Sequence, residues 1–413
     1  MPPVTQAERV TYRKVLANRE FAAILVGQGL STVGDQLARI AIAILVFERT
    51  GSALGASATY AVSYLTYLLG GPVLSAVSDR YPRAAVMVIC DVLRAPAVLA
   101  LCTSGIPLWV YFLVLALVGL LSPPFDSARS GLQPDLLPGD QYVVGNGLMN
   151  LVLQFGQVVG FLAGGALVGL ATARGALAID AASFLVSAGF VLACVRPRPA
   201  AQRADDRSGL LADTAKGLRL VRSAPLLRRY LLFSVLTSAA VITPEGLAVP
   251  VARALHGGDF AAGVLTASIP AGTVIGGLAV LRVAPERRLV LLPRLAMLCT
   301  VPLLLSPLIT SIPLLVGLWV LAGLGNCVTL VSAAAYMQSC PPEYRSRAYG
   351  VAVTLLQVIQ GVSLLVSGWT AAPLGSRAAV AVVTGAVVVG LLTLPDLRPG
   401  AQENADSFRG NAG

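Results

Sequence analysis

The sequence predicts an all-α, multi-pass membrane protein with twelve transmembrane helices in two six-helix bundles. Of its 413 residues, 56% are hydrophobic and only 12% are charged, whereas about a quarter of the residues in a soluble domain are charged. The mean hydropathy is +0.78. The apolar residues also gather in long runs, and one polar stretch divides those runs equally. Disordered, collagen-like and disulfide-rich classes are excluded.

The apolar runs have the length that a membrane requires, because about 20 apolar residues cross roughly 30 Å of hydrocarbon. The runs follow one another along the whole chain, with edges good to a few residues. They lie at residues 21–46, 57–78, 84–104, 107–125, 146–169, 173–195, 230–252, 261–281, 289–307, 312–337, 347–370 and 377–394.

The polar stretch 196–229 separates the first six runs from the last six. We therefore expect five segments along the chain. They are an N-terminal segment (1–20), an N-terminal six-helix bundle (21–195), a basic central loop (196–229), a C-terminal six-helix bundle (230–394) and a C-terminal tail (395–413).

Basic residues predict the orientation, because Lys and Arg accumulate in cytoplasmic loops. With both termini and every even-numbered loop inside, 23 of the 30 Lys and Arg residues are cytoplasmic and four lie outside. This placement accounts for the net charge of +10 without nucleic acid. Only two basic residues are Lys, which suggests a GC-rich bacterial genome. We expect a bacterial plasma-membrane protein.

The two halves resemble each other, since a shift of 203 residues superimposes features of both. One offset that serves distant regions indicates an internal repeat, as in transporters built from two parallel halves. The matched pairs are Pro82 and Pro285, Pro138 and Pro341, Gln154 and Gln357, Gln157 and Gln360, and Gly165 and Gly368.

Residues 70–94 resemble the loop motif of the major facilitator superfamily, Gly-x-x-x-Asp-Arg-x-Gly-Arg-Arg. Asp79, Arg80 and Arg83 match it, while Ser75 and Pro82 replace its glycines and Ala84 its last basic residue. Gly34 and Asp35, the segment TGSA at 50–53 and the segments PDLLP and GNGL within 134–148 resemble the actinobacterial exporters of that family. The resemblance implies the major facilitator fold, alternating access between the two halves, and a monomer.

The fifth run contains glycines whose spacing is similar to the antiporter motif of the same family, with Phe161 in place of its proline. Small residues three or four apart form a strip where another helix backbone packs closely. The strip favours either an antiporter or ordinary helix packing. Its glycines are Gly147, Gly156, Gly160, Gly164 and Gly165.

Ionisable side chains inside the runs are candidate functional residues, because a charge at the bilayer centre costs on the order of 3 kcal/mol or more. For each one the alternative is a structural ion pair between helices. Seven qualify: Asp35, Arg39, Asp91, Arg94, Asp180, Glu245 and Arg294.

Asp35 is the main candidate for proton coupling. Gln28, Ser31, Asp35 and Arg39 follow one another at helical spacing and share one face, which we expect to line a water-filled cavity. Glu245 follows Pro244, which should kink the seventh helix, and has no cation within a turn. Desolvation disfavours its ionised form, so it is either a second proton carrier or part of a structural network.

The remaining charges are assigned to structural roles. We expect Asp91 and Arg94 to form an ion pair near the cytoplasmic end of the third helix. That pair would belong to a cytoplasmic latch that is closed in the outward-facing state. Asp180 and Arg294 are expected near a membrane edge, as surface pairs or snorkelling side chains. The latch residues are Asp79, Arg80, Arg83, Asp91, Arg94 and Asp126.

Two further stripes are compatible with a cavity wall. The amides either hydrogen-bond a substrate or join neighbouring helices, and the tyrosines either face an aromatic ligand or pack in the core. The stripes consist of Gln154 and Gln157, their repeat mates Gln357 and Gln360, and Tyr60, Tyr64 and Tyr67.

No catalytic or cofactor motif is apparent. A P-loop sequence is missing, the six cysteines show no paired spacing, and His256 is the single histidine, so we expect neither enzyme activity, nor a metal, nor a cofactor beyond the proton gradient. The expected function is proton-coupled export of a hydrophobic or amphipathic small molecule. The alternatives are uptake or exchange of a polar metabolite, a channel or receptor, and, last, a membrane enzyme.

Overall fold

The computed structural model describes residues 12–74, 80–170, 172–198, 219, 224–340 and 345–393, which form helices joined by short turns. The first half of this part of the chain contains α1 (Tyr12–Leu16), α2 (Arg19–Thr50), α3 (Ala53–Leu74), α5 (Arg83–Ala100), α6 (Leu108–Leu120), α7 (Ser122–Leu136), α8 (Asp140–Leu170) and α9 (Ala173–Cys194).

The second half repeats this pattern. It contains α11 (Pro225–Val241), α12 (Thr243–Ala254), α13 (Asp259–Leu281), α14 (Pro285–Val290), α15 (Leu292–Leu304), the short 3₁₀ turn η1 (Ser306–Leu308), α16 (Ile312–Gly325), α17 (Cys327–Ser339), α18 (Arg345–Leu374) and α19 (Ser376–Thr393).

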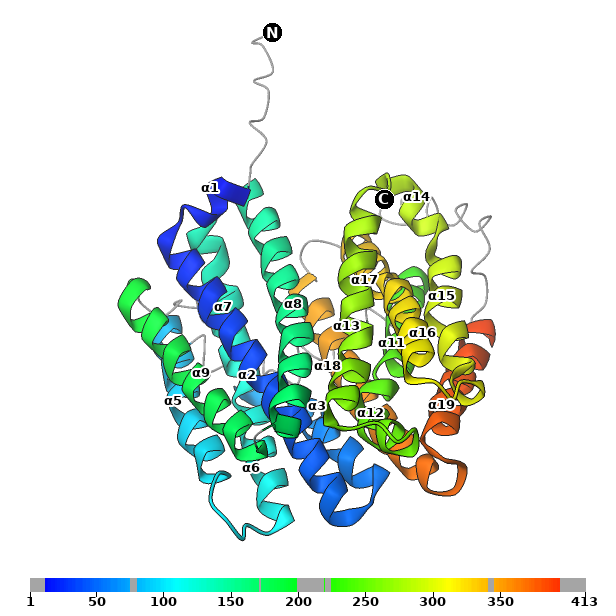
Figure 1. The fold of residues 1–413 in the computed structure, drawn as a ribbon. Helices are drawn as coiled ribbons and strands as arrows, with labels where there is room; N and C mark the ends of the chain where they lie inside the picture. Colours follow the sequence, from blue (N-terminus) through cyan, green and yellow to red (C-terminus); the bar gives the residue numbers. More distant parts are fainter. Residues whose placement is uncertain are drawn as a thin grey trace.

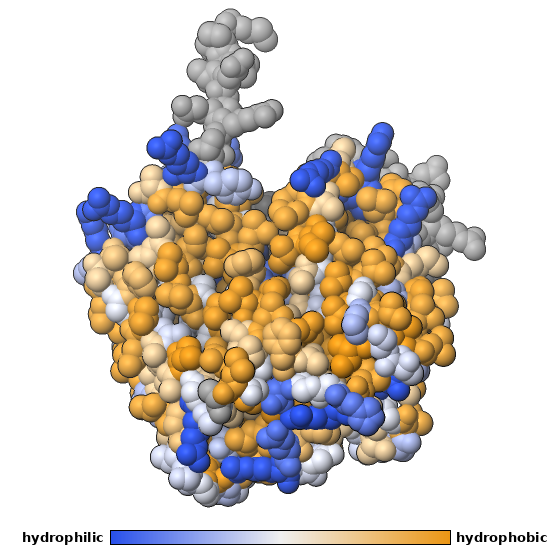
Figure 2. Space-filling model, viewed as in Figure 1, coloured by the Kyte–Doolittle hydropathy of each residue, from blue (hydrophilic) through white to orange (hydrophobic). Residues whose placement is uncertain are grey.

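Ten helical segments of the described chain are long and apolar enough to cross a membrane. The chain is therefore a multi-pass membrane protein. The two other predicted spans are the helices α3 and α5, and α5 carries three charged residues. Figure 2 shows a broad hydrophobic band across the middle of the molecule, with hydrophilic side chains toward its two ends.

Several spans consist of two consecutive helices with a break between them. The fourth span breaks between α6 and α7, where Pro123 and Pro124 follow Ser122, and the tenth breaks at Asn326 between α16 and α17. The seventh breaks at Ile242, just before Pro244. Proline lacks a backbone N–H and is favoured at a helix start, so the sequences in the fourth and seventh spans begin a new helix, whereas no proline follows Asn326. The matching breaks in the fourth and tenth spans agree with the repeat.

The two halves lie side by side, as Figure 1 shows in blue to green and in green to red. They meet mainly through two helix pairs, α3 with α18 and α8 with α13. These are the second and eleventh spans and the fifth and eighth spans, and the repeat exchanges one pair for the other. The interface between the halves therefore has the same internal symmetry as the sequence.

Polar contacts between the halves gather at the end of the molecule that carries the turns after α2 and α12. Ser57 donates a hydrogen bond of 3.0 Å to the carbonyl oxygen of Gly246. Arg253 pairs with Glu48 of the other half at 2.9 Å and with Asp259 of its own half at 2.5 Å. A shared hydrophobic core lies next to these contacts. The halves are closed together at this end, opposite α1 and α14 (Figure 1).

Four glycines of the predicted strip on α8 form close helix crossings. Gly156, Gly160 and Gly164 lie against α2, and a Cβ atom on Gly160 would lie 2.6 Å from the carbonyl oxygen of Val33. Gly165 instead faces α13 of the other half, where its Cβ would lie 2.8 Å from Cα of Gly263. Gly147 does not join them, because the space around it is open and it lies beyond the crossing.

Replacing Gly160 with alanine should destabilise the protein, because the added methyl group meets the α2 backbone. We expect Gly160→Ala to lower the free energy of unfolding by about 1–3 kcal/mol. Gly147→Ala, on the same helix in open space, should be neutral or stabilising by up to about 1 kcal/mol. Thermal unfolding of the purified protein in detergent compares the two, and equal effects would contradict the packing role.

Candidate functional site

A cavity of about 500 Å³ lies between the two halves. Its volume falls within the roughly 300–1,000 Å³ of sites that hold drug-sized ligands. The N-terminal half contributes α2, α3 and α5 to α9 to its wall, and the C-terminal half contributes α11 to α13, α17 and α18. Its floor is the closed end described above.

Most of the predicted cavity residues line this space. They are Gln28, Asp35, Arg39, Tyr64, Tyr67, Gln154, Gln157, Glu245, Gln357 and Gln360. Two predicted residues do not line it. Ser31 is 2% exposed and lies outside the lining. Tyr60 is 0% exposed and packs in the hydrophobic core shared by the two halves. Tyr60 lies nearer the closed end of α3 than the other two tyrosines, past the floor of the cavity.

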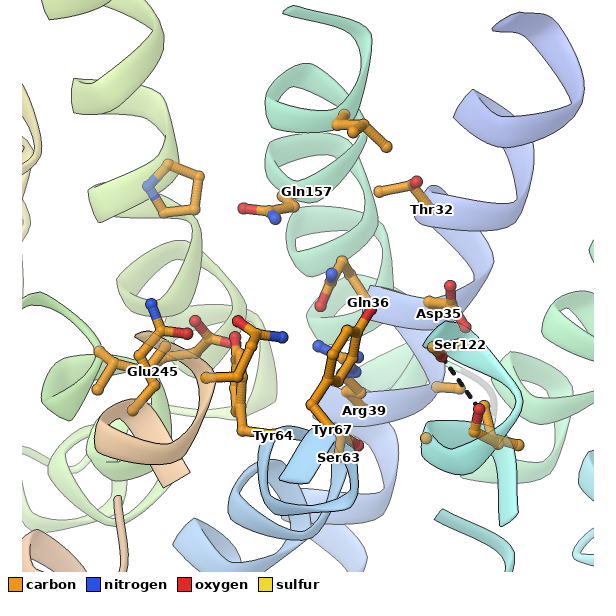
Figure 3. A pocket seen from close by; sticks show the side chains of 18 of the residues that line it. Thr32, Asp35, Gln36, Arg39, Ser63, Tyr64, Tyr67, Ser122, Gln157 and Glu245 are labelled. Carbon is orange, nitrogen blue, oxygen red and sulfur yellow. Dashed lines mark hydrogen bonds between the residues drawn. The ribbon is translucent and has the colours of Figure 1, made fainter. Parts of the chain in front are cut away.

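Arg39 lies between Asp35 of its own helix and Glu245 of the other half, as Figure 3 shows. Its guanidinium carbon lies 5.9 Å from the ring centre of Tyr64, a cation–π distance. In the described chain, neither carboxylate lies within the 4 Å of Arg39 that defines an ion pair. The positive charge of Arg39 nevertheless acts on both carboxylates. The predicted Asp35–Arg39 face is thus present, but Arg39 is shared.

Asp180 lies buried in the cavity wall and forms neither a surface pair nor a snorkelling side chain, which corrects the expectation from the sequence. It is 2% exposed, and one carboxylate oxygen, Oδ1, has no hydrogen-bond partner in the described chain. A Cβ on Gly34 would lie 2.7 Å from that oxygen, so Asp180 packs against α2 beside Asp35. Asp35, Arg39 and Arg94 all interact electrostatically with it.

A signal for Asp180 was present in the sequence. Asp180, Ser183 and Ser187 form a polar stripe on α9, and they face Gly27 and Gly34 of α2. Two small residues on one helix opposite a polar stripe on another indicate a close crossing. Such a crossing carries the acid into the protein interior.

Two other acids near the cavity are already neutralised by arginines. Asp91 pairs with Arg94 at 3.4 Å, and their side chains are 0% and 5% exposed. Asp126 pairs with Arg129 at 3.1 Å and accepts a 2.6 Å hydrogen bond from the hydroxyl of Tyr67.

The predicted latch residues do not form one cluster in the described part of the chain. Arg83 binds Asp135 at 3.0 Å and also the carbonyl oxygen of Gly131, while Arg80 is exposed. Asp79 lies outside the described residues. The ion pair of Asp91 and Arg94 is at mid-helix rather than at the cytoplasmic end, with Arg94 over the rings of Phe125 and Phe184.

The remaining acids of the cavity outnumber the remaining arginines. With the pairs Asp91–Arg94 and Asp126–Arg129 set aside, Asp35, Asp180 and Glu245 share the single cation Arg39 among the described residues that line the cavity. If all three acids were ionised, the site would carry two uncompensated negative charges. Buried charges are stable only when compensated, so this site is suited to take up positive charge.

Several polar cavity residues were not singled out from the sequence. Most are single serines, threonines and amides within apolar runs, which no spacing pattern distinguishes from helix-packing residues. Those facing the cavity are Thr32, Gln36, Ser63, Ser122, Asn150, Ser238, Thr273, Asn326 and Thr329.

No group of three or more His, Cys, Asp or Glu side chains suited to a metal ion occurs among the described residues. None of the six cysteines, all within the described residues, forms a disulfide.

Comparison with known proteins agrees with a membrane protein built from two bundles of helices. The family model described as Major Facilitator Superfamily matches residues 24–363. The multidrug efflux pump Tap of Mycobacterium tuberculosis is 25% identical over 421 residues, covering 94% of this chain and 97% of that one. The macrolide efflux protein A of Streptococcus pyogenes is 22% identical over 367 residues, covering 86% and 90%. The uncharacterized transporter YfiS of Bacillus subtilis is 25% identical over 224 residues, about half of each chain.

Solved structures of low sequence identity share the fold. A mutant of the nucleoside transporter NupG superposes with a TM-score of 0.73 at 14% identity, covering 92% of this chain and 100% of that one. A bacterial homologue of the lysosomal transporter Spinster, in an inward-facing and unoccupied conformation, gives a TM-score of 0.69 at 15% identity, covering 90% and 95%.

Removing Arg94 should destabilise the protein more than removing the whole ion pair. Arg94→Met leaves the carboxylate of Asp91 buried without a cation, and we expect a loss of about 3–5 kcal/mol in the free energy of unfolding. The double variant Asp91→Asn/Arg94→Met should recover most of this loss. Unfolding of both proteins in detergent tests the pair, and an equal loss in both would refute it.

Proposed function

Because this chain belongs to the Major Facilitator Superfamily, it is a membrane transporter, and we propose that it exports a hydrophobic or amphipathic small molecule in exchange for protons. The observation that carries this proposal is the charge imbalance in the cavity. Asp35 and Asp180 lie side by side. Arg39 is the arginine of the described cavity lining that is not ion-paired with another acid.

One proton is the simplest way to balance these two neighbouring acids. Two carboxylates at one buried site do not both ionise readily, so Asp35 and Asp180 hold a proton between them when no other cation is near. Asp35 faces the cavity and is accessible to water, and it exchanges this proton. The proton gradient is then the energy source.

The direction of transport is supported by two relatives that cover most of this chain, since Tap and the macrolide protein are both named efflux proteins. The glycine strip of α8 adds to this, because its spacing resembles the antiporter motif. In the proposed cycle, substrate enters from the cytoplasm through the open end of the cavity while the acid pair releases its proton. Reprotonation from outside then favours substrate release.

The molecule works as a monomer in the bacterial plasma membrane, with both termini in the cytoplasm. In this orientation the open end faces the cytoplasm. The loop residues Asp79, Arg80 and Arg83 stabilise the opposite, outward-facing state, in which the cytoplasmic ends of the two halves come together.

Uptake or exchange of a polar metabolite is the second candidate function. It is favoured by the polar lining of the cavity, where six glutamine amides and two tyrosine hydroxyls face the same space. The direction of accumulation in vesicles under an imposed pH gradient distinguishes the two functions.

Replacing Asp35 with asparagine should abolish the coupling. Asparagine keeps the size of the side chain but binds no proton, so Asp35→Asn should reduce export driven by a pH gradient to the level of vesicles without the protein. The measurement is substrate flux in proteoliposomes, with and without the gradient.

The matched control is Asp140→Asn, which removes an exposed acid outside the cavity. Full gradient-driven export by Asp35→Asn would exclude this residue as the coupling acid.

A further inference from the structure

The charged groups of the cavity are distributed unequally between the halves. All three arginines of the lining, Arg39, Arg94 and Arg129, belong to the N-terminal half. In the described wall of the C-terminal half, Glu245 is the single charged residue. A ligand that bridges the halves therefore meets a negative charge on the side of α12.

Glu245 has no direct partner in the described chain. Neither a hydrogen bond nor an ion pair reaches its carboxylate, and the side chain is partly exposed to the cavity. The charged group whose field acts on it is Arg39. Tyr60 and Tyr64 of α3 also interact with the carboxylate of Glu245. The amides of Gln357 and Gln360 on α18 are neutral and do not compensate its charge.

The surroundings of Glu245 suit an amphipathic cation. The ring of Tyr64 already faces the guanidinium of Arg39, so a cation at this level also gains a cation–π contact. Val241, Ile242 and Ile269 of the same wall are apolar, and they provide a surface for the apolar body of a ligand.

We propose that Glu245 binds the positively charged group of the substrate, and that the substrate is a monovalent amphipathic cation that replaces the more distant charge of Arg39 as the partner of this carboxylate. The inference rests on the proposed export function and adds the substrate class to it. The bound cation compensates the second of the two excess negative charges in the cavity, and the proton compensates the first.

The same exchange connects the substrate to the proton. With a cation at Glu245, the charge of Arg39 acts on Asp35 and Asp180 alone. Arg94 also acts on both of these acids, and Asp126 acts on Asp35. A closer guanidinium stabilises the ionised form of the acid pair and favours proton release. Arg39 is a positioning residue in this scheme, because it acts on the acids and not on the substrate.

The test is equilibrium binding to the purified full-length protein in lipid nanodiscs, without any proton gradient. The ligands are tetraphenylphosphonium and tetraphenylborate, which have nearly the same size and shape but opposite charge. The wild-type protein should bind the phosphonium and discriminate against the borate. Equal binding of both ions, or no binding of the phosphonium, would overturn the proposal.

Three variants locate the charge. Glu245→Gln should weaken phosphonium binding by at least about tenfold, as expected for the loss of a partly buried charge partner, whereas Glu245→Asp should retain most of the affinity. Asp140→Asn, an exposed acid on α8, is the control for the loss of one negative charge and should leave the affinity within about twofold.

Arg39→Gln keeps the proposal testable if Glu245→Gln fails to fold. It removes the competing cation, so phosphonium should bind more tightly, and misfolding cannot produce a gain of affinity. Unchanged or weaker binding in a folded Arg39→Gln protein contradicts the exchange.

Proteoliposome flux separates this inference from the proposed function. If phosphonium binding depends on Glu245 but no flux follows a pH gradient, the cation site stands and proton coupling is wrong. If gradient-driven export of other compounds persists while the phosphonium does not bind, proton coupling stands and the cation site is wrong.

Discussion

The need to compensate charge within the membrane is the constraint on which the rest of this structure depends. Water solvates a charge cheaply, but a protein interior surrounded by lipid does not. Two arginines therefore neutralise Asp91 and Asp126 directly, whereas Asp35, Asp180 and Glu245 compete for Arg39. The helices are arranged so that this competition takes place in the cavity between the halves that all four side chains line.

Hydropathy predicted the spans well, because the cost of placing polar groups in lipid acts on every residue of a run. As far as the structure describes them, the twelve predicted runs each fall on one helix or on consecutive helices. Pro244 also marked the break next to Glu245 correctly. The breaks of the fourth and tenth spans depend on packing as well as on proline, since Asn326 is not followed by one.

The sequence predicted less well which way a single side chain points and how deeply it is buried, because both depend on helices that are distant in sequence. Asp180 is close to one end of its run, yet the glycines of α2 draw α9 inward at this point. Tyr60 shares a stripe with Tyr64 and Tyr67, but it lies where the two halves have already closed. A one-dimensional pattern gives the helix face correctly and leaves open where along that face the cavity ends.

The contact of Gly165 with Gly263 has a mechanical consequence. Here the two halves touch backbone to backbone, with no interlocking side chains that must withdraw before the helices move. At such a contact α8 and α13 are able to change their crossing angle with little loss of buried surface and few changes of side-chain rotamer. The pair thus joins the two bundles at the closed end through a contact that a change in their relative angle need not break.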